Sequence, residues 1–133
     1  MTETNFMNDK IFLDTNVLVY LHDKTESEKQ KVAKELLDIH FENIVLSSQI
    51  LGELFNVLVY KIKITGVDAK TIVEKMSNDF PIISIKKNFV LKAMDIHLKY
   101  QYRYWDSLVI ATALLNGCDI LYSEDLHEGQ LIE

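Results

Sequence analysis

The chain has 133 residues, of which 48% are hydrophobic and 26% are charged. These proportions are those of a globular protein, and the length allows one core of ordinary size, so we expect residues 1–133 to form a single domain. The 14 lysines and arginines against 20 acidic residues give a formal net charge of −6. The chain therefore has no overall attraction for polyanions, and nucleic acid would have to bind through a local basic patch or a bound metal ion.

The sequence carries no sign of export or of membrane insertion. Residues 1–5 are polar and include an acid, unlike a secretory signal peptide, and no apolar run approaches the roughly 20 residues of a membrane span. Cys118 is the single cysteine, which excludes a disulfide within the chain. We therefore expect a cytoplasmic protein that does not bind membranes.

Strands and helices are predicted to alternate along the chain. Short apolar runs predict strands at residues 10–13, 43–47, 81–85 and 118–122. Apolar residues at helical spacing predict helices at residues 17–21, 25–40, 48–62, 68–79, 88–101 and 106–116. This alternation predicts an α/β fold with a central parallel sheet of four strands, covered by helices on both faces.

The same spacing predicts which helix faces turn inward. The expected inner residues are Val32, Leu36 and Ile39 in helix 25–40, and Leu91, Met94 and Leu98 in helix 88–101. The apolar stripe of helix 48–62 is wider than one sheet face requires. That width is compatible with a contact between two copies of the chain and equally with ordinary burial.

Four acidic residues follow predicted strands or begin predicted helices. Asp14 ends the first strand, Glu53 lies about one turn into the helix after the second strand, Asp106 begins a helix, and Asp125 (or Glu124) follows the fourth strand. The carboxyl ends of parallel strands meet at one edge of the sheet, where ligands usually bind. Each acid alone is more often a helix cap or a surface residue. Glu53, however, interrupts an apolar run, so its carboxylate must be paired, solvated in a cleft or bound to a metal ion.

Carboxylates that converge repel one another, which raises their pKa values and destabilises the empty fold. A divalent cation relieves this repulsion, and hard oxygen ligands favour Mg²⁺ or Mn²⁺. Zinc fits less well, because the single cysteine and the four histidines show no ligand spacing. The pattern therefore favours a magnesium or manganese site.

The four acidic stretches together resemble the motifs of the PIN-domain nucleases, most closely those of VapC-type toxins from toxin–antitoxin pairs. The resemblance covers essentially the whole chain and lies in residues 14–16, 48–53, 105–111 and 123–126. It implies a doubly wound three-layer α/β/α sandwich with four or five strands, and a Mg²⁺- or Mn²⁺-dependent ribonuclease activity. By position, the catalytic and metal-binding acids would be Asp14, Glu53, Asp106 and Asp125, with Asn16 and Ser123 as supporting polar residues. Related toxins are usually homodimers that an antitoxin protein inhibits, so RNA, a second copy and an antitoxin are the implied partners.

The chain departs from the family pattern in one respect. Family members usually continue beyond residues 129–132 into a final edge strand, which in this sequence is short or missing. An exposed sheet edge would then need covering.

Two other functions are open on the sequence alone. The domain could be a PIN-like binding module or scaffold without catalysis, although the presence of all four acids argues against a degenerate site. An aspartate at the end of the first strand is also the nucleophile of haloacid-dehalogenase-type phosphatases. That family expects a second aspartate two positions later, where this chain has Asn16.

Overall fold

The structure is a computed structural model that describes residues 9–123 and 130–131. Its strands are β1 (Ile11–Leu13), β2 (Ile44–Ser47), β3 (Ile82–Ile83), β4 (Ile120–Tyr122) and β5 (Gln130–Leu131). Its helices are α2 (Thr15–Tyr20), α3 (Ser27–His40), the short 3₁₀ helix η1 (Phe41–Asn43), α4 (Ser48–Tyr60), α5 (Gly66–Asp79), α6 (Lys87–Tyr100) and α7 (Tyr104–Leu115). Within the described ranges, no helix is long and apolar enough to cross a membrane.

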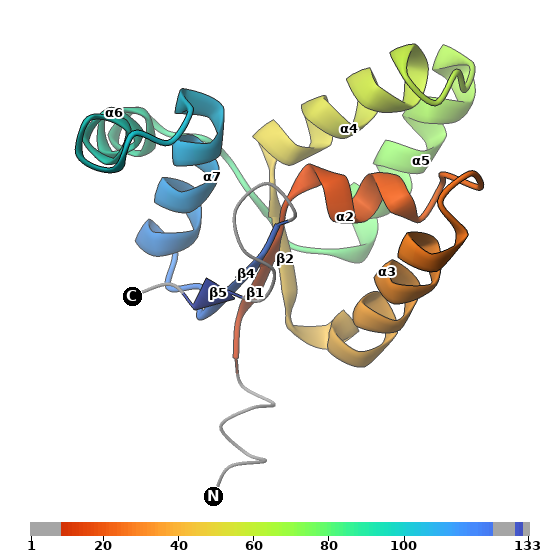
Figure 1. Ribbon diagram of the computed structural model, residues 1–133, viewed down its shortest axis with the longest axis horizontal. Helices are drawn as coiled ribbons and strands as arrows, with labels where there is room; N and C mark the ends of the chain where they lie inside the picture. The colour runs from red at the N-terminus through yellow and green to blue at the C-terminus, as the bar shows by residue number, and fades with distance from the viewer. Residues whose placement is uncertain (1–8, 124–129, 132–133) are drawn as a thin grey trace, which may run out of the picture.

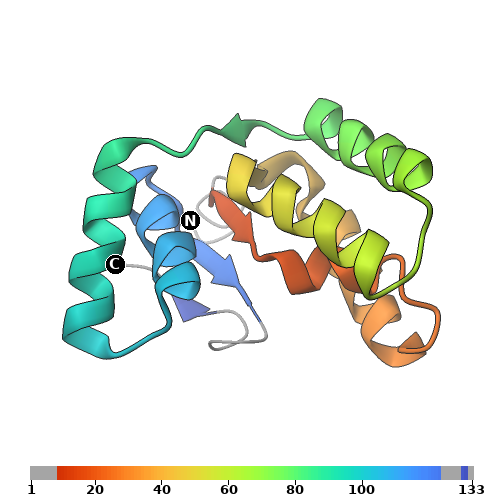
Figure 2. The same ribbon diagram turned by 90° about the horizontal axis from the view of Figure 1, so that it is seen from above.

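The strands form one five-stranded sheet in the order β3-β2-β1-β4-β5. Strands β1 to β4 are parallel, and β5 pairs antiparallel with β4 at the edge. Helices α2 to α5 lie on one side of the sheet, and α6 and α7 lie on the other, as Figure 1 and the view from above in Figure 2 show. The three-layer α/β/α fold with a parallel four-stranded core is therefore confirmed, and the fifth strand is a two-residue antiparallel addition.

The chain changes direction across the sheet once. It builds outward from β1 through β2 to β3, and then returns through α6 and α7 to add β4 on the other side of β1. Right-handed connections place the helices of the two halves on opposite faces. The order of the strands thus reverses at β1 and β4, and the carboxyl ends of the strands at such a switch point are the usual place for a ligand.

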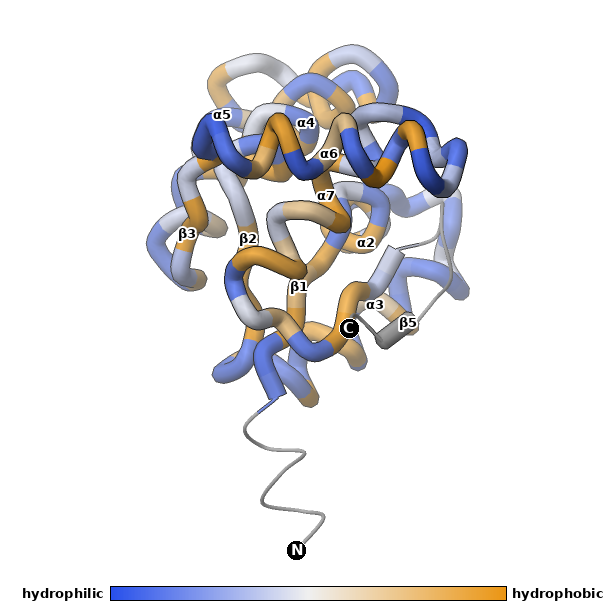
Figure 3. Tube along the Cα trace, turned by 90° about the vertical axis from the view of Figure 1, so that its left-hand side faces the viewer, coloured by the Kyte–Doolittle hydropathy of each residue, from blue (hydrophilic) through white to orange (hydrophobic). Residues whose placement is uncertain are grey.

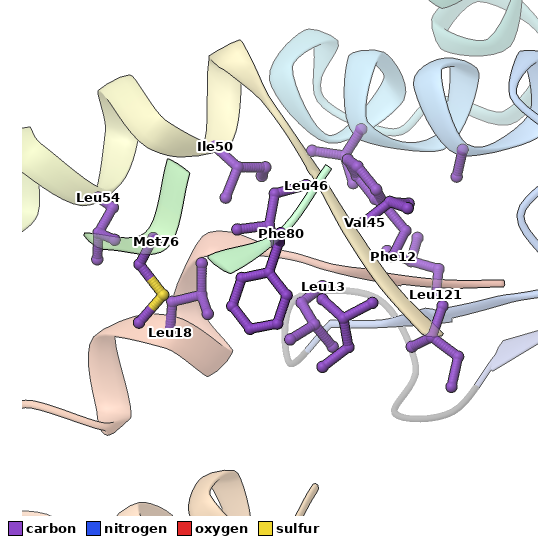
Figure 4. Close-up of a cluster of buried hydrophobic side chains, with 14 of the residues drawn as sticks. Phe12, Leu13, Leu18, Val45, Leu46, Ile50, Leu54, Met76, Phe80 and Leu121 are labelled. Atoms are coloured by element: carbon purple, nitrogen blue, oxygen red, sulfur yellow. The ribbon is translucent and has the colours of Figure 1, made fainter. Parts of the chain in front are cut away.

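The central strand is buried on both faces. Ile11, Phe12 and Leu13 of β1 have no exposed surface, as expected for a parallel strand between two helical layers. Around them pack side chains of both neighbouring strands and of the flanking helices, including Leu46 and Ile50 (Figure 4). This core fixes the direction and register of β1, and with them the position of the residue that follows it, Asp14.

The inward faces of two helices differ from the sequence prediction. In α6 the predicted inner residues Leu91, Met94 and Leu98 are exposed, and in α3 Val32 and Ile39 are exposed, whereas Leu36 packs partly against the core as predicted. The buried side chains are Phe89, Ala93 and Ile96 in α6 and Ala33 and His40 in α3. Both helices carry two apolar stripes, and the face that contains a small alanine is the one that approaches its neighbours.

Candidate active site at the carboxyl edge of the sheet

Asp14 is the residue at which β1 turns into α2. It is the N-cap of α2, and its Oδ1 accepts a hydrogen bond from the backbone N–H of Thr15 at 2.7 Å. Its Oδ2 accepts a hydrogen bond from Ser123 Oγ at 2.6 Å, directly after β4. Only 5% of Asp14 is exposed. The carboxylate is therefore held by one group that follows β1 and one that follows β4.

The surroundings of Asp14 disfavour its ionised form. Its pKa is raised, mainly because burial removes the carboxylate from water, and the charges of Glu53 and Asp106 raise it further. The hydrogen bonds from Ser123 and Thr15 oppose this effect, since they stabilise the carboxylate. Asp14 is thus a buried acid whose ionised form a nearby cation would stabilise.

Glu53 reaches the same place from α4, a helix that Ser47 caps by accepting the backbone N–H of Ile50. Its Oε1 accepts a hydrogen bond from Thr15 Oγ1 at 2.7 Å. Its Oε2 accepts one from Gln49 Nε2 at 3.1 Å, one helical turn earlier in α4. Both oxygens of Glu53 are thus oriented by neighbouring side chains.

Asp106 lies in the first turn of α7, which covers the opposite face of the sheet from α4 (Figure 1). Its Oδ2 lies 3.3 Å from Arg103 Nε in an ion pair whose arginine is largely exposed. Gln49 Nε2 also donates to the backbone carbonyl of Trp105, at 3.3 Å. This bond joins the start of α7 to the start of α4, so Gln49 links the helix that carries Asp106 to the one that carries Glu53.

Asp14, Glu53, Asp106 and Ser123 therefore come to one edge of the sheet, as the sequence predicted. Asn16 lies half-buried in the first turn of α2. Asp125 and the competing Glu124 lie outside the described residues.

Thr15 and Gln49 were missed by the sequence reasoning, which gave neither of them a role. Thr15 lies between two residues that were selected as functional, and Gln49 precedes Glu53 by four positions on one helix. The i,i+4 spacing of a glutamine and an acid is a signal that could have identified Gln49.

The available ligands fit a hard divalent cation. Within the described residues, no three acidic, imidazole or thiol groups lie close enough to hold a metal ion by themselves. Burial and, in addition, the negative charges of Glu53 and Asp106 nevertheless raise the pKa of Asp14, and a cation would relieve the repulsion among these carboxylates. Gln49 Oε1 is in addition a buried oxygen without a hydrogen-bond partner. Carboxylate and amide oxygens are the ligand types of magnesium and manganese sites.

The sequence model of the PIN domain family matches residues 11–127. The chain belongs to the PIN domain family. The match begins at β1 and includes all four of the predicted acids. No curated protein sequence matches the chain significantly.

Solved structures of toxins and toxin–antitoxin complexes share the fold of this PIN domain. VapC20 of Mycobacterium tuberculosis, a toxin that cleaves the sarcin–ricin loop, has a TM-score of 0.74 and 17% identity over 86% of this chain and 88% of that one. A toxin–antitoxin complex from Klebsiella pneumoniae has a TM-score of 0.68 and 18% identity over 90% of this chain and 89% of that one. A DNA-bound VapBC from Salmonella typhimurium has a TM-score of 0.64 and 16% identity over 83% of each chain. At these identities the likeness shows the fold.

Replacing Ser123 with alanine is expected to shift metal binding to higher pH. The Ser123 hydrogen bond lowers the pKa of Asp14, so its loss raises that pKa further, and a metal ion binds the deprotonated carboxylate. The rise in melting temperature caused by Mn²⁺, followed from about pH 4 to about pH 7, gives the midpoint. The control is Ser77→Ala, since Ser77 donates only to a backbone carbonyl within α5. A midpoint shared by all three proteins would contradict the prediction.

Proposed function

We propose that this PIN domain is a metal-dependent ribonuclease that hydrolyses RNA phosphodiester bonds, and that it is the toxin of a toxin–antitoxin pair. The observation that carries the proposal is the environment of Asp14. This buried carboxylate has a raised pKa and lies near Glu53 and Asp106 at the switch point of the sheet. Carboxylates brought near one another at such a switch point are what a metal-dependent hydrolase requires.

The residues that would hold Mg²⁺ or Mn²⁺ are Asp14, Glu53, Asp106 and Asp125. A bound ion of this kind supplies a water of lowered pKa and positive charge for the scissile phosphate. Thr15 and Ser123 keep Asp14 oriented, and Thr15 and Gln49 keep Glu53 oriented, so these acids need little rearrangement on binding. Arg103 pairs with Asp106 through a largely exposed side chain, and its remaining guanidinium donors would be available to a phosphate.

Two features argue against competing chemistry. Burial raises the pKa of the Cys118 thiol to about 11, so this cysteine is protonated at neutral pH and is a poor nucleophile. Membership of the PIN family also makes the haloacid-dehalogenase alternative wrong, in agreement with Asn16 at the position where that family needs an aspartate. The scaffold alternative is decided by the experiment below.

The same proposal includes two protein partners. Structures with this fold from Klebsiella and Salmonella are toxin–antitoxin complexes, which supports an antitoxin partner for this chain. A homodimer is supported by the outer face of α4, where Phe55 and Tyr60 are exposed beside the buried stripe. Size measurement of the purified chain in solution, with and without a co-expressed antitoxin, tests both.

The test of the activity is cleavage of an end-labelled, structured RNA by purified protein in Mn²⁺. We expect cleavage that EDTA abolishes and that Asp106→Asn reduces roughly 10³-fold, because the variant loses a carboxylate that would hold the cation that stabilises the transition-state charge. The matched control is Asp68→Asn. Asp68 occupies the same third helical position in α5 as Asp106 does in α7, so this variant should cleave normally.

Cleavage that survives in EDTA or in Asp106→Asn would come from a contaminant or from another site, and would contradict the proposal. Absence of cleavage across a panel that includes total cellular RNA would favour the scaffold alternative.

A further inference from the structure

Aromatic side chains crowd the connection between α6 and α7. Residues 100–105, the aromatic segment, contain Tyr100, Tyr102, Tyr104 and Trp105. The rings of Tyr104 and Trp105 meet edge to face with centroids 4.9 Å apart, and those of Tyr100 and Tyr102 stack at 5.9 Å. Trp105 is nevertheless 60% exposed, although a side chain of this size is usually largely buried. A large aromatic surface is thus presented to solvent.

The aromatic segment is fixed next to the acidic site. Trp105 immediately precedes Asp106, and its carbonyl accepts the hydrogen bond from Gln49, which also donates to Glu53. Gln101 adopts a left-handed backbone conformation with φ of 65°, which ends α6 and reverses the chain. The Trp105 backbone therefore lies beside the proposed site, so an RNA several nucleotides long can contact both the Trp105 ring and the carboxylates.

Positive charge is concentrated on the same part of an otherwise acidic chain. Residues 86–105 contain five lysines and arginines and a single acid, Asp95, while the whole chain has a net charge of −6. Lys99 Nζ lies over the ring of Tyr100, 5.2 Å from its centroid, and the Arg103 side chain is 79% exposed. Helix α6, which carries most of these cations, runs across the surface above α7, with polar stretches alternating along it (Figure 3).

We propose that the aromatic segment binds unpaired nucleotides of the RNA substrate, with Trp105 stacked on a base and with Arg103 and Lys99 contacting phosphates. The inference rests on the proposed ribonuclease function and adds the form of RNA that the site accepts. Exposed aromatic rings beside cations are how proteins hold single-stranded RNA, because every unpaired base offers a flat face. Bases inside a duplex are already stacked on both faces and cannot use Trp105.

The chain contains one tryptophan, so its fluorescence reports on Trp105 alone. The experiment uses the Asp106→Asn protein in Mn²⁺, which keeps the RNA intact, and titrates it with a single-stranded RNA of about 12 nucleotides. A length of about 12 nucleotides lies within the roughly 4–16 that one such binding surface covers. We expect saturable quenching by the single strand, and little quenching by the same RNA annealed to its complement.

Substitutions then separate stacking from general folding effects. Trp105→Leu should weaken binding of the fluorescently labelled RNA, measured by anisotropy, roughly tenfold, and Trp105→Phe should restore most of the affinity. Phe41→Leu is the matched control, because Phe41 is a 44% exposed aromatic residue in η1, which precedes β2 at the opposite edge of the sheet from the carboxylates. This variant should bind the RNA as tightly as the unmodified protein.

Several outcomes would overturn the inference: no quenching, equal quenching by the duplex, or unchanged affinity of Trp105→Leu. A blue shift of the emission that grows with protein concentration, without RNA, would also overturn it, since Trp105 would then lie between two copies of the chain. Failure of the proposed function is distinct from these results. It would show as quenching by single-stranded RNA together with no metal-dependent cleavage by the unmodified protein.

Discussion

Replacing Asp14 with asparagine is expected to stabilise the metal-free protein while it abolishes RNA cleavage. The pKa of Asp14 is raised, so the folded protein at neutral pH holds an ionised carboxylate that is more stable in the unfolded chain. Asparagine removes the charge and keeps an oxygen that can accept the Thr15 hydrogen bond. Its amide group can donate to Ser123 Oγ, whose hydroxyl is free to rotate. We expect a melting temperature a few degrees higher and a cleavage rate reduced by at least roughly 10³-fold.

The stabilisation expected from Asp14→Asn should depend on pH. A carboxylate whose folded pKa lies above its ordinary value of 3.8 binds more protons in the folded state than in the unfolded state. The free energy of unfolding therefore falls as the pH rises from about 3.8 through the folded pKa, and it stays lower above that point. Asp14→Asn should lack this loss, so the advantage of the variant should appear on going from acid to neutral pH.

The measurement is thermal unfolding of both proteins in EDTA over this pH range, with Asp68→Asn as the control. Asp68 lies on the surface of α5, so removing its charge should leave the pH profile of stability unchanged. An Asp14→Asn protein that is less stable than the unmodified one at neutral pH would show that Asp14 is mainly a structural cap of α2. This result would contradict the proposed metal site at Asp14.

The position of Asp14 could be predicted because the signal is local. A short apolar run that stops at an acid predicts a buried strand and its end, and the parallel pairing of β1 with β2 and β4 follows from the alternation of strands and helices. The position of Asp106 at the same edge required one further step, namely that the helices before β4 form a hairpin. The structure confirms that step, since Gln49 joins the starts of α4 and α7.

The inward face of α6 could not be predicted in the same way. Leu91, Met94 and Leu98 recur at helical spacing as regularly as Phe89, Ala93 and Ile96 do. The choice between the two stripes depends on α7, where Ala111 offers space for a close approach of the neighbouring helix. Such a preference is a property of the pair of helices, and it cannot be read from the spacing within one of them.

The exposed stripe of α6 is not required by the core. It adjoins the aromatic segment at the end of the helix, and Leu98 is 73% exposed beside Lys99. The residues that the sequence analysis assigned to the core of α6 thus lie exposed on the helix that also carries Lys87, Lys92 and Lys99. This combination is consistent with a surface that contacts a ligand rather than the interior of the protein.

Saturating Mn²⁺ is expected to raise the melting temperature of the unmodified protein by roughly 10 °C. A cation that binds only the folded state adds about 2.7 kcal/mol at a concentration near 100 times its dissociation constant, which corresponds to a shift of this size for a chain of this length. The proposed ligands Asp14, Glu53 and Asp106 follow β1 or lie in α4 and α7, so the unfolded chain does not bring them together. The gain should be larger at neutral than at acid pH, because a protonated Asp14 does not bind metal.

The variants decide whether this stabilisation comes from the proposed site. Asp14→Asn and Asp106→Asn should lose most of the Mn²⁺ effect, and Glu74→Gln should retain it, since Glu74 forms only an exposed ion pair with Lys70. Mg²⁺ should reproduce the shift at higher concentration, because this ion gives up its water shell reluctantly. A Mn²⁺ shift that is equal in all four proteins would locate the bound ion elsewhere on the surface. If neither ion changes the melting temperature of the unmodified protein, the proposed metal site is wrong. The scaffold alternative would then be favoured.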